Sequence, residues 1–160
     1  MNAIFLSTLI FACVGAGLVG GIFFAFSTFV IHALDRLPAV ESIAAMQSIN
    51  VAVLNPLFFA AFFGTGLAAA VLLASTAFLP SNTRAFVIAA LLAYVVGSIF
   101  VTVSMNVPLN ENLASLPASA FSLQSWRDFR DPWLFWNHVR TACSLAAAAG
   151  FALALAKLAR

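Results

Sequence analysis

Charged side chains are almost absent from long stretches of this chain. Residues Ala3 to Ile31 contain no Asp, Glu, Lys, Arg or Pro, and the runs 51–79, 85–105 and 133–156 are nearly as apolar. Charged residues make up 8% of the 160 residues, whereas an ordinary soluble domain contains about 25%. This scarcity excludes a soluble catalytic domain. The net charge of +2 comes from few ionisable groups, which excludes the basic surface of a nucleic-acid-binding protein.

Cysteine is also scarce. Cys13 and Cys143 lie in different apolar runs, without CxxC spacing and without a neighbouring His or acidic residue. We therefore expect both to be buried packing residues. A disulfide between them requires that the first and fourth runs are adjacent and that the two thiols lie at matching depths.

The apolar runs have the length of membrane-spanning helices. A helix rises about 1.5 Å per residue, so roughly 20 apolar residues cross a hydrocarbon core about 30 Å thick. The first run lacks a positively charged start and is longer than the roughly 7–15 residues of a signal-peptide core, so we expect a retained span. The sequence predicts one all-α transmembrane domain over residues 1–160, an integral membrane four-helix bundle with up-down-up-down connections. The predicted spans cover residues 4–34, 55–79, 84–105 and 133–157.

The connection between the first and second spans and the connection between the third and fourth spans are predicted to differ. Apolar residues at near-helical spacing in Pro38–Asn50 favour a short interfacial helix after the first span. Asn55-Pro56 is typical of a helix start, and Pro108 is expected to end the third span. The connection 106–132 is predicted to be a long loop, which is either a lid or a solvated interfacial segment.

Small and aromatic residues indicate how the spans pack. Gly17 and Gly21 form a GxxxG pattern, and Gly66, Ala70 and Ala74 repeat it in the second span. Small residues let helix backbones approach closely in lipid. We expect packing within the bundle, with a homodimer contact as the alternative. Four phenylalanines in the far half of the first span are candidates for lining an aromatic cavity, although lipid-facing or core packing is the simpler interpretation. They are Phe23, Phe24, Phe26 and Phe29.

Polar residues gather at one end of the predicted bundle. The connectivity places the end of span one, the start of span two, the end of span three and the start of span four on one side. Lys and Arg are similarly frequent at both ends, so the positive-inside rule assigns neither side to the cytoplasm. We expect a multi-pass protein of a bacterial inner (plasma) membrane with its site at the polar end. The candidate substrate-binding residues there are Trp133, Trp136, Asn106, Asn110, Asn50, Asn55, Gln47 and Trp126.

The densest polar cluster begins the fourth span. On a helix, Trp133, Asn137 and Arg140 lie three or four residues apart and share one face. An arginine costs about 2.5–3.5 kcal/mol at the middle of a membrane on insertion scales, and it normally faces the protein interior with a partner. We expect Arg140 to pair with Asp35, Glu111 or an anionic ligand group. The alternative is that it snorkels to the interface beside an aromatic belt.

Four motifs occur in order along nearly the whole chain. They are Gly20-Gly21 with Phe24-Ala25-Phe26-Ser27, the stretch from Ala45-Met46-Gln47-Ser48-Ile49-Asn50 to Asn55-Pro56, Asn106-Val107-Pro108-Leu109-Asn110, and Trp133 to Thr141 with Trp136-Asn137 and Arg140-Thr141. Together they resemble the anthrone oxygenase-like family of small four-span membrane proteins. Most members of that family are a domain of unknown function, and fungal polyketide-pathway relatives are tied to oxidation of anthrones to anthraquinones.

The resemblance implies a membrane-embedded oxygenase-like protein that acts on or binds a planar aromatic molecule, anthrone- or phenol-like, without a metal or other cofactor. Such a monooxygenase needs a base, a partner for the oxyanion and a slot for aromatic rings. The catalytic candidates are His138 or His32 as the base, Asn137, Asn106 or Asn110 as donors to the oxyanion, and Arg140 as the holder of negative charge. Trp133 or Trp136 can stack on the substrate. His138 is adjacent to Asn137 and so points about 100° away from it on a helix, which counts against this base.

Two other function classes remain open from the sequence. His32 and His138 are predicted at similar depth on facing helices, where bundles often hold haem or a metal. No His-x-x-x-His or carboxylate-His pattern accompanies them. The third possibility is a non-enzymatic membrane protein that binds a small molecule or a partner, for which the packing glycines and the polar end suffice.

Overall fold

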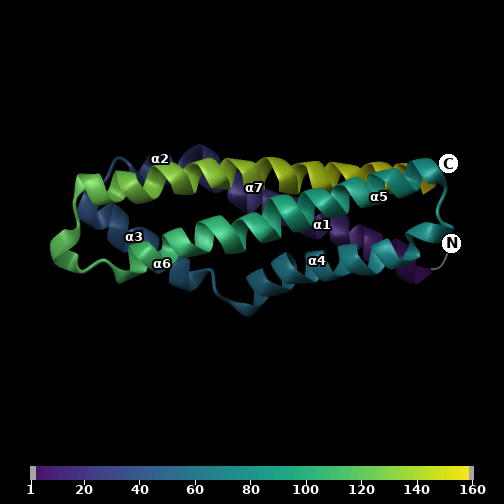
Figure 1. The fold of residues 1–160 in the computed structure, drawn as a ribbon, viewed down its shortest axis with the longest axis horizontal. Coiled ribbons are helices and arrows are strands. Elements are labelled where there is room, and N and C mark those ends of the chain that lie inside the picture. The colour runs from purple at the N-terminus through teal and green to yellow at the C-terminus, as the bar shows by residue number, and fades with distance from the viewer. Residues whose placement is uncertain (1–2, 159–160) are drawn as a thin grey trace.

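The computed structural model describes residues 3–158 and consists of long helices aligned along one axis (Figure 1). Four of the helices in this part of the chain are long and apolar enough to cross a membrane, which confirms the all-α membrane bundle. They cover Ala3–Leu34, Pro56–Ser75, Thr83–Ser115 and Leu123–Leu158. Each contains, or nearly matches, one of the spans expected from the sequence.

Several of these helices are built from more than one segment. The first joins α1, η1 and α2, and the third joins α5, η3, η4 and α6, where the inserted η segments η1, η3 and η4 are π-helical. The elements in chain order are α1 (Ala3–Ala25), η1 (Phe26–Val30), α2 (Ile31–Leu34), α3 (Ala39–Ala52), α4 (Pro56–Ser75), η2 (Thr76–Phe78), α5 (Ser81–Tyr94), η3 (Val95–Phe100), η4 (Thr102–Asn106), α6 (Val107–Ser115), η5 (Ala118–Ala120) and α7 (Leu123–Leu158).

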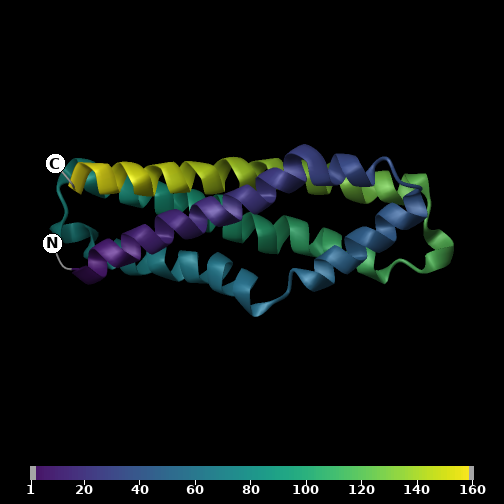
Figure 2. The same cartoon turned by 180° about the vertical axis from the view of Figure 1, so that it is seen from behind.

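The second span begins at a break between α3 and α4. Asn55 adopts an extended backbone, its side-chain oxygen accepts a hydrogen bond from the amide of Phe58 at 3.0 Å, and Pro56 follows in the first turn of α4. This is the cap that the Asn55-Pro56 pair predicts. The predicted helix after the first span is α3, which extends from the far end of the bundle back towards α4 (Figure 2).

The predicted long loop over residues 106–132 is wrong. Helix α6 continues the third span to Ser115 and α7 begins at Leu123, so only residues 116–122 connect them. Pro108 does not end the span because it lies in the first turn of α6, directly after the π-helical segment η4. Wider π-helical turns are a known way to accommodate a proline inside a membrane helix.

Buried side chains form two cores, one behind the other along the bundle. The first core joins α1, α4, α5 and α7 within the apolar part of the molecule. The second joins the shorter helices α2, α3 and α6 to the first half of α7, with Ile43, Leu113 and Trp126 among its buried members. The polar end is therefore a packed helical extension and not a set of loops.

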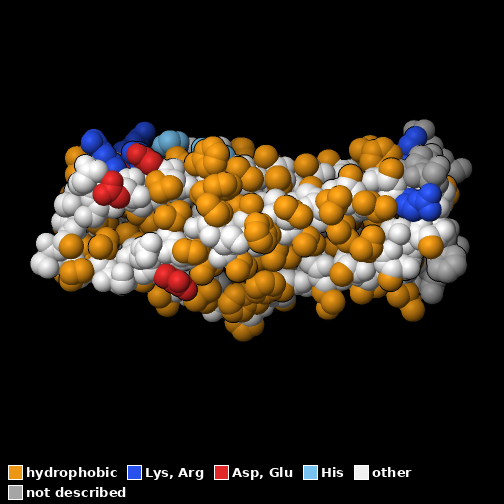
Figure 3. Space-filling model, in the orientation of Figure 1, with side chains coloured by type: hydrophobic (Ala, Val, Ile, Leu, Met, Phe, Trp, Pro, Cys, Tyr) orange, Lys and Arg blue, Asp and Glu red, His pale blue; other side chains and the backbone are white. Residues whose placement is uncertain are grey.

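The position of the membrane follows from the helix lengths. The 20 residues of α4 span about 30 Å, and the stretch from His138 to Lys157 has the same length, which matches the thickness of the hydrocarbon core. Charged side chains gather at the two ends of the space-filling view and are sparse between them (Figure 3). One boundary of the membrane therefore lies near the break at Asn55 and the other near Lys157.

Small residues allow the spans to approach closely, and Gly66 is an expected glycine that does so, because a Cβ added there would lie 2.6 Å from a methyl carbon of Ile99. A Cβ added to Gly20 would lie 2.9 Å from a methyl carbon of Leu145, whereas one added to Gly21 meets nothing within 4 Å. The Gly17 and Gly21 pair thus contributes little to packing within the chain. Cys13 and Cys143 are both free thiols.

Candidate functional site

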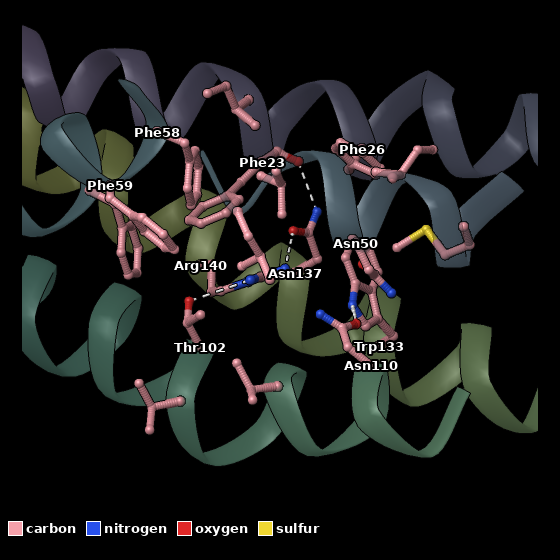
Figure 4. Close-up of a pocket in the computed structure, with 18 of the residues that line it drawn as sticks. Phe23, Phe26, Asn50, Phe58, Phe59, Thr102, Asn110, Trp133, Asn137 and Arg140 are labelled. Atoms are coloured by element: carbon pink, nitrogen blue, oxygen red, sulfur yellow. Dashed lines mark hydrogen bonds between the residues drawn. The ribbon is translucent and has the colours of Figure 1, made fainter. Parts of the chain in front are cut away.

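An apolar cavity of about 170 Å³ lies at the level where α4 begins. Its walls come from every long helix and from α3, so it is formed only when the whole bundle is assembled (Figure 4). Aromatic rings dominate the lining, and Phe58 and Phe62 stack with ring centroids 5.5 Å apart. A small set of polar side chains interrupts this lining. They are Asn50, Thr102, Asn110, Trp133, Asn137 and Arg140.

Arg140 is the charged residue of this lining and is 5% exposed. Its guanidinium lies against two rings, with the Cζ atom 4.2 Å from the ring centroid of Phe23 and 5.2 Å from that of Trp133. Both distances are within the range of a cation–π interaction. The side chain therefore faces the protein interior, and the alternative of snorkelling to the interface does not describe it.

No carboxylate of residues 3–158 lies within ion-pair distance of Arg140. Asp35, a predicted partner, instead accepts hydrogen bonds from Arg130 at 2.9 Å and from the indole of Trp126 at 2.8 Å. Glu111, the other predicted partner, is exposed. Arg140 is thus a buried cation held by neutral groups, and its Nε has no hydrogen-bond partner in the described structure.

Asn137 connects Arg140 to the first span. Its side-chain oxygen accepts a hydrogen bond from Nη2 of Arg140 at 2.7 Å, while its Nδ2 donates to the carbonyl of Phe23 and to the hydroxyl of Ser27, both at 2.8 Å. Thr141 is part of the same network, with its hydroxyl 3.0 Å from that of Ser27. Asn137 is fully buried, so these bonds fix the guanidinium in one position.

A line of polar contacts joins the third span to α7. Ser144 donates to Ser98 at 3.0 Å, Arg140 donates to Thr102 at 3.3 Å, and Asn106 donates to the carbonyl of Trp133 at 3.1 Å. These residues of the third span recur every fourth position, as does Asn110 after them, so they share one helix face. The π-helical segments η3 and η4 present this face to α7.

The outer end of the cavity carries two amides beside an indole. The Nε1 of Trp133 donates to Asn110 at 2.8 Å, which fixes the plane of the indole. Asn50 approaches from α3, and its Nδ2 is buried without a hydrogen-bond partner in the described structure. Figure 4 shows Asn50 and Arg140 apart in the cavity, with Asn137 between them.

The structure brings together five of the residues predicted from the sequence and places the others elsewhere. The five that line the cavity are Asn50, Asn110, Trp133, Asn137 and Arg140. Asn106 is outside the cavity lining and supports this group by donating a hydrogen bond to the carbonyl of Trp133. Gln47 joins α3 to α6 by donating to the carbonyl of Leu113, and Asn55 caps α4.

The remaining predicted residues lie outside the cavity lining. Trp126 packs in the second core and Trp136 contacts Phe135 edge to face. His32 and His138 are exposed, and His32 lies 3.9 Å from Asp35. The histidines are thus placed neither at the cavity nor against Arg140.

The sequence interpretation missed Thr102 and undervalued two phenylalanines. Phe23 and Phe26 line the cavity, whereas Phe24 and Phe29 are exposed. Thr102 was detectable, because it precedes Asn106 and Asn110 at four-residue spacing on a predicted helix.

Comparison with known proteins identifies the family. The sequence model of the anthrone oxygenase family matches residues 51–150. This range includes α4, the third span and the part of α7 that carries Trp133, Asn137 and Arg140. No curated protein and no solved structure matches the chain. Because the match covers more than half of the sequence, this membrane protein belongs to the anthrone oxygenase family.

Proposed function

We propose that this protein is a membrane-embedded, cofactor-independent monooxygenase for a planar aromatic molecule of the anthrone or phenol type, in a bacterial inner membrane. The observation that carries the proposal is Arg140, a buried cation without a carboxylate partner in the described structure, at the wall of an aromatic cavity. Burial of an unpaired charge is costly, and such residues within membrane spans usually serve function.

The cavity suits an aromatic anion in both shape and charge. Its walls include Phe58, Phe62 and Trp133, which offer flat apolar surfaces to a ring system. The guanidinium of Arg140 supplies a positive charge that an enolate or phenolate oxygen can pair with in an environment of low dielectric constant. Asn137 holds the guanidinium in place, so this stabilisation needs little reorganisation during reaction.

An anthrone gives the required anion by losing a proton from the carbon opposite its carbonyl group. The charge then delocalises onto the carbonyl oxygen, which Arg140 stabilises. The anion transfers one electron to dioxygen, the two radicals combine at that carbon to form a peroxide, and loss of water leaves the second carbonyl. One anthrone and one dioxygen give one anthraquinone and one water. The proton lost in the first step is returned to the peroxide so that water can leave, and no histidine or carboxylate of the described residues lines the cavity to carry it.

A second candidate function is binding without turnover. The observation that favours it is the same lack of a titratable base in the cavity lining within residues 3–158. A binding protein needs only the cation and the rings, whereas an oxygenase must also accelerate proton loss. Measurements of turnover and of binding therefore distinguish the two functions.

The test measures oxidation of 1,8-dihydroxyanthrone by the purified protein in lipid nanodiscs. Quinone formation and oxygen uptake should exceed those of empty nanodiscs, which report spontaneous oxidation. Arg140→Gln should lower the protein-dependent rate at least about tenfold, equivalent to about 1.4 kcal/mol of transition-state stabilisation. A rate equal to that of the wild type in this variant would exclude the proposed role of Arg140.

Two controls make the result specific to the cavity. Arg130→Gln removes another arginine of α7, which pairs with Asp35 outside the cavity, and should leave the rate within about twofold of the wild type. The combined variant His32→Ala, His138→Ala should also retain activity, because neither side chain lines the cavity. Binding of the anthrone without any protein-dependent oxidation would favour the second candidate.

A further inference from the structure

The cavity opens through the side of the bundle. Its rim includes Leu54 from the break before α4, Phe59 and Phe63 from α4, and Val103 from η4, and these side chains are 63%, 39%, 49% and 54% exposed. All four are apolar and lie within or at the edge of the hydrocarbon layer defined by α4. A molecule that enters here comes from the bilayer.

The size of the cavity limits what it can enclose. An apolar cavity of about 150 Å³ accommodates one benzene ring, and this cavity measures about 170 Å³. It therefore encloses one substituted ring, and any larger apolar part of the ligand must extend through the opening. A ring that carries a flexible hydrocarbon tail meets this requirement, since the tail remains among the lipid acyl chains.

Two unpaired donors define the polar groups of that ring. Nε of Arg140 and Nδ2 of Asn50 are both buried without hydrogen-bond partners in the described structure, and both residues line the cavity. An unsatisfied buried donor costs about 1–3 kcal/mol. Because the two donors lie apart in the cavity (Figure 4), a ligand that satisfies both must carry two acceptor oxygens that are separated from each other.

From these three observations we propose that the cavity binds a lipid-dissolved 1,4-benzoquinone with a hydrocarbon tail. One quinone oxygen accepts a hydrogen bond from Arg140 and the other from Asn50, while the tail leaves the bundle between Leu54 and Val103. This inference rests on the proposed function only in using the same ring-binding site. It adds a second ligand class, a tailed single ring with two opposed oxygens, to the planar aromatic substrate proposed above.

The test compares three probes by quenching of tryptophan fluorescence in nanodiscs, with empty nanodiscs used to correct for partition into lipid. The probes are a 1,4-benzoquinone with a decyl tail, the same quinone with a methyl group in place of the tail, and decylbenzene. Because the tail stays in lipid, the correction removes its contribution, so both quinones should bind at least tenfold more tightly than decylbenzene and the tailed quinone no more weakly than the untailed one. Weaker binding of the tailed quinone than of the untailed one, or equal binding of decylbenzene, would overturn the inference.

Two variants locate the contacts, each with a matched comparison. Val103→Phe narrows the opening and should weaken the tailed quinone at least tenfold more than the untailed quinone. Leu67→Phe, at a position on α4 that is 68% exposed and outside the cavity, should leave both quinones unchanged. Asn50→Leu should weaken the tailed quinone about tenfold but not decylbenzene. Equal effects of Val103→Phe and Leu67→Phe on the tailed quinone would contradict entry at this point.

The result can be separated from that of the anthrone assay. If anthrone is oxidised in an Arg140-dependent manner but the tailed quinone does not bind, the inference fails and the proposed oxygenase stands. If the tailed quinone binds but no anthrone is oxidised, the site binds quinones and the proposed oxygenase fails. Because the probe comparison uses the wild-type protein, it tests the inference even where a variant does not fold.

Discussion

The guanidinium of Arg140 keeps its charge uncompensated although it is well packed. Asn137 and Thr102 accept its hydrogen bonds, and the rings of Phe23 and Trp133 lie against it. These neutral partners reduce the cost of removing the cation from water but do not cancel its charge. An anionic group that enters the cavity therefore gains an interaction between opposite charges that no group of the described structure already makes with Arg140.

Replacement of Thr102 by aspartate should supply the carboxylate that Arg140 lacks. Thr102 Oγ1 lies 3.3 Å from Nη1 of Arg140, so an aspartate at this position is close enough to form an ion pair. We expect Thr102→Asp to weaken binding of 1,8-dihydroxyanthrone at least about tenfold, or about 1.4 kcal/mol. Titration calorimetry in nanodiscs without oxygen measures this change.

Thr102→Val is the matched control because it keeps the shape of the side chain without adding charge. It removes a hydroxyl that also donates to the carbonyl of Ser98, and we expect binding within about threefold of the wild type. Equal weakening by the two substitutions would show that the hydroxyl, and not the free charge of Arg140, determines affinity.

The sequence revealed Arg140 but not its partners. Its position inside an apolar run and its spacing from Trp133 and Asn137 are local properties, and these predicted an inward-facing residue correctly. Which side chains meet it depends on how the third span is rotated against α7. Asp35 was a reasonable partner by charge, yet its carboxylate pairs with Arg130 and Trp126 in the second core.

The break between α3 and α4 shapes the mouth of the cavity. Asn55 caps the start of α4, and the first turn of α4 then places Phe58 and Phe59 in the lining of the cavity. The position of these two rings therefore depends on where α4 begins. A cap that fixes this position links a local sequence signal to the binding site.

Asn55→Ala should destabilise the protein by about 1 kcal/mol, because it removes the side-chain oxygen that accepts a hydrogen bond from the amide of Phe58. We also expect a lower affinity for aromatic ligands as the first turn of α4 frays. Unfolding in detergent micelles, followed by circular dichroism, measures the stability. Asn55→Asp keeps an acceptor oxygen and should retain most of it, so equal losses in both variants would argue against capping.

Helix starts were easier to predict than helix ends. Asn55-Pro56 acts through its own backbone and neighbouring amides, so the sequence alone identified the start of α4. Pro108 also disfavours a helix locally, but the π-helical segment η4 precedes it and the helix continues to Ser115. The continuation of the helix depends on its packing against α7, which supplies partners such as Trp133 for the polar face of the third span. A rule based on neighbouring residues cannot predict such a contact.

At the scale of the whole molecule, α7 is the helix against which the others assemble. It packs against α1 and α5 within the membrane and against α3 and α6 in the extension beyond it (Figures 1 and 2). Helices in lipid associate by close packing and hydrogen bonding, because lipid tails are as apolar as the side chains. Glycines at these contacts are therefore important for assembling the cavity.

The sequence predicted that small residues pack the spans and identified one of these residues, Gly66. Gly17 and Gly21 have the familiar spacing, yet the other close contacts form at Gly15, Gly20, Gly97 and Gly150. Spacing reports which residues share a face of one helix. The face that meets a neighbour is determined by all contacts of the bundle together, including the polar line between the third span and α7.

Gly97→Ala tests this dependence on close approach. A Cβ at Gly97 would collide with the Sγ and Cβ atoms of Cys143, so η3 and α7 must move apart, and overpacking of this kind costs about 1–3 kcal/mol. We expect a lower unfolding midpoint and, because Thr102 and Arg140 lie on the same two helices, weaker binding of 1,8-dihydroxyanthrone. Gly21→Ala is the control, since a Cβ there meets nothing within 4 Å and the substitution should be neutral or stabilise the helix by up to about 1 kcal/mol. Equal stability of the two variants would mean that the third span and α7 can separate slightly without cost, and that the cavity does not depend on their contact.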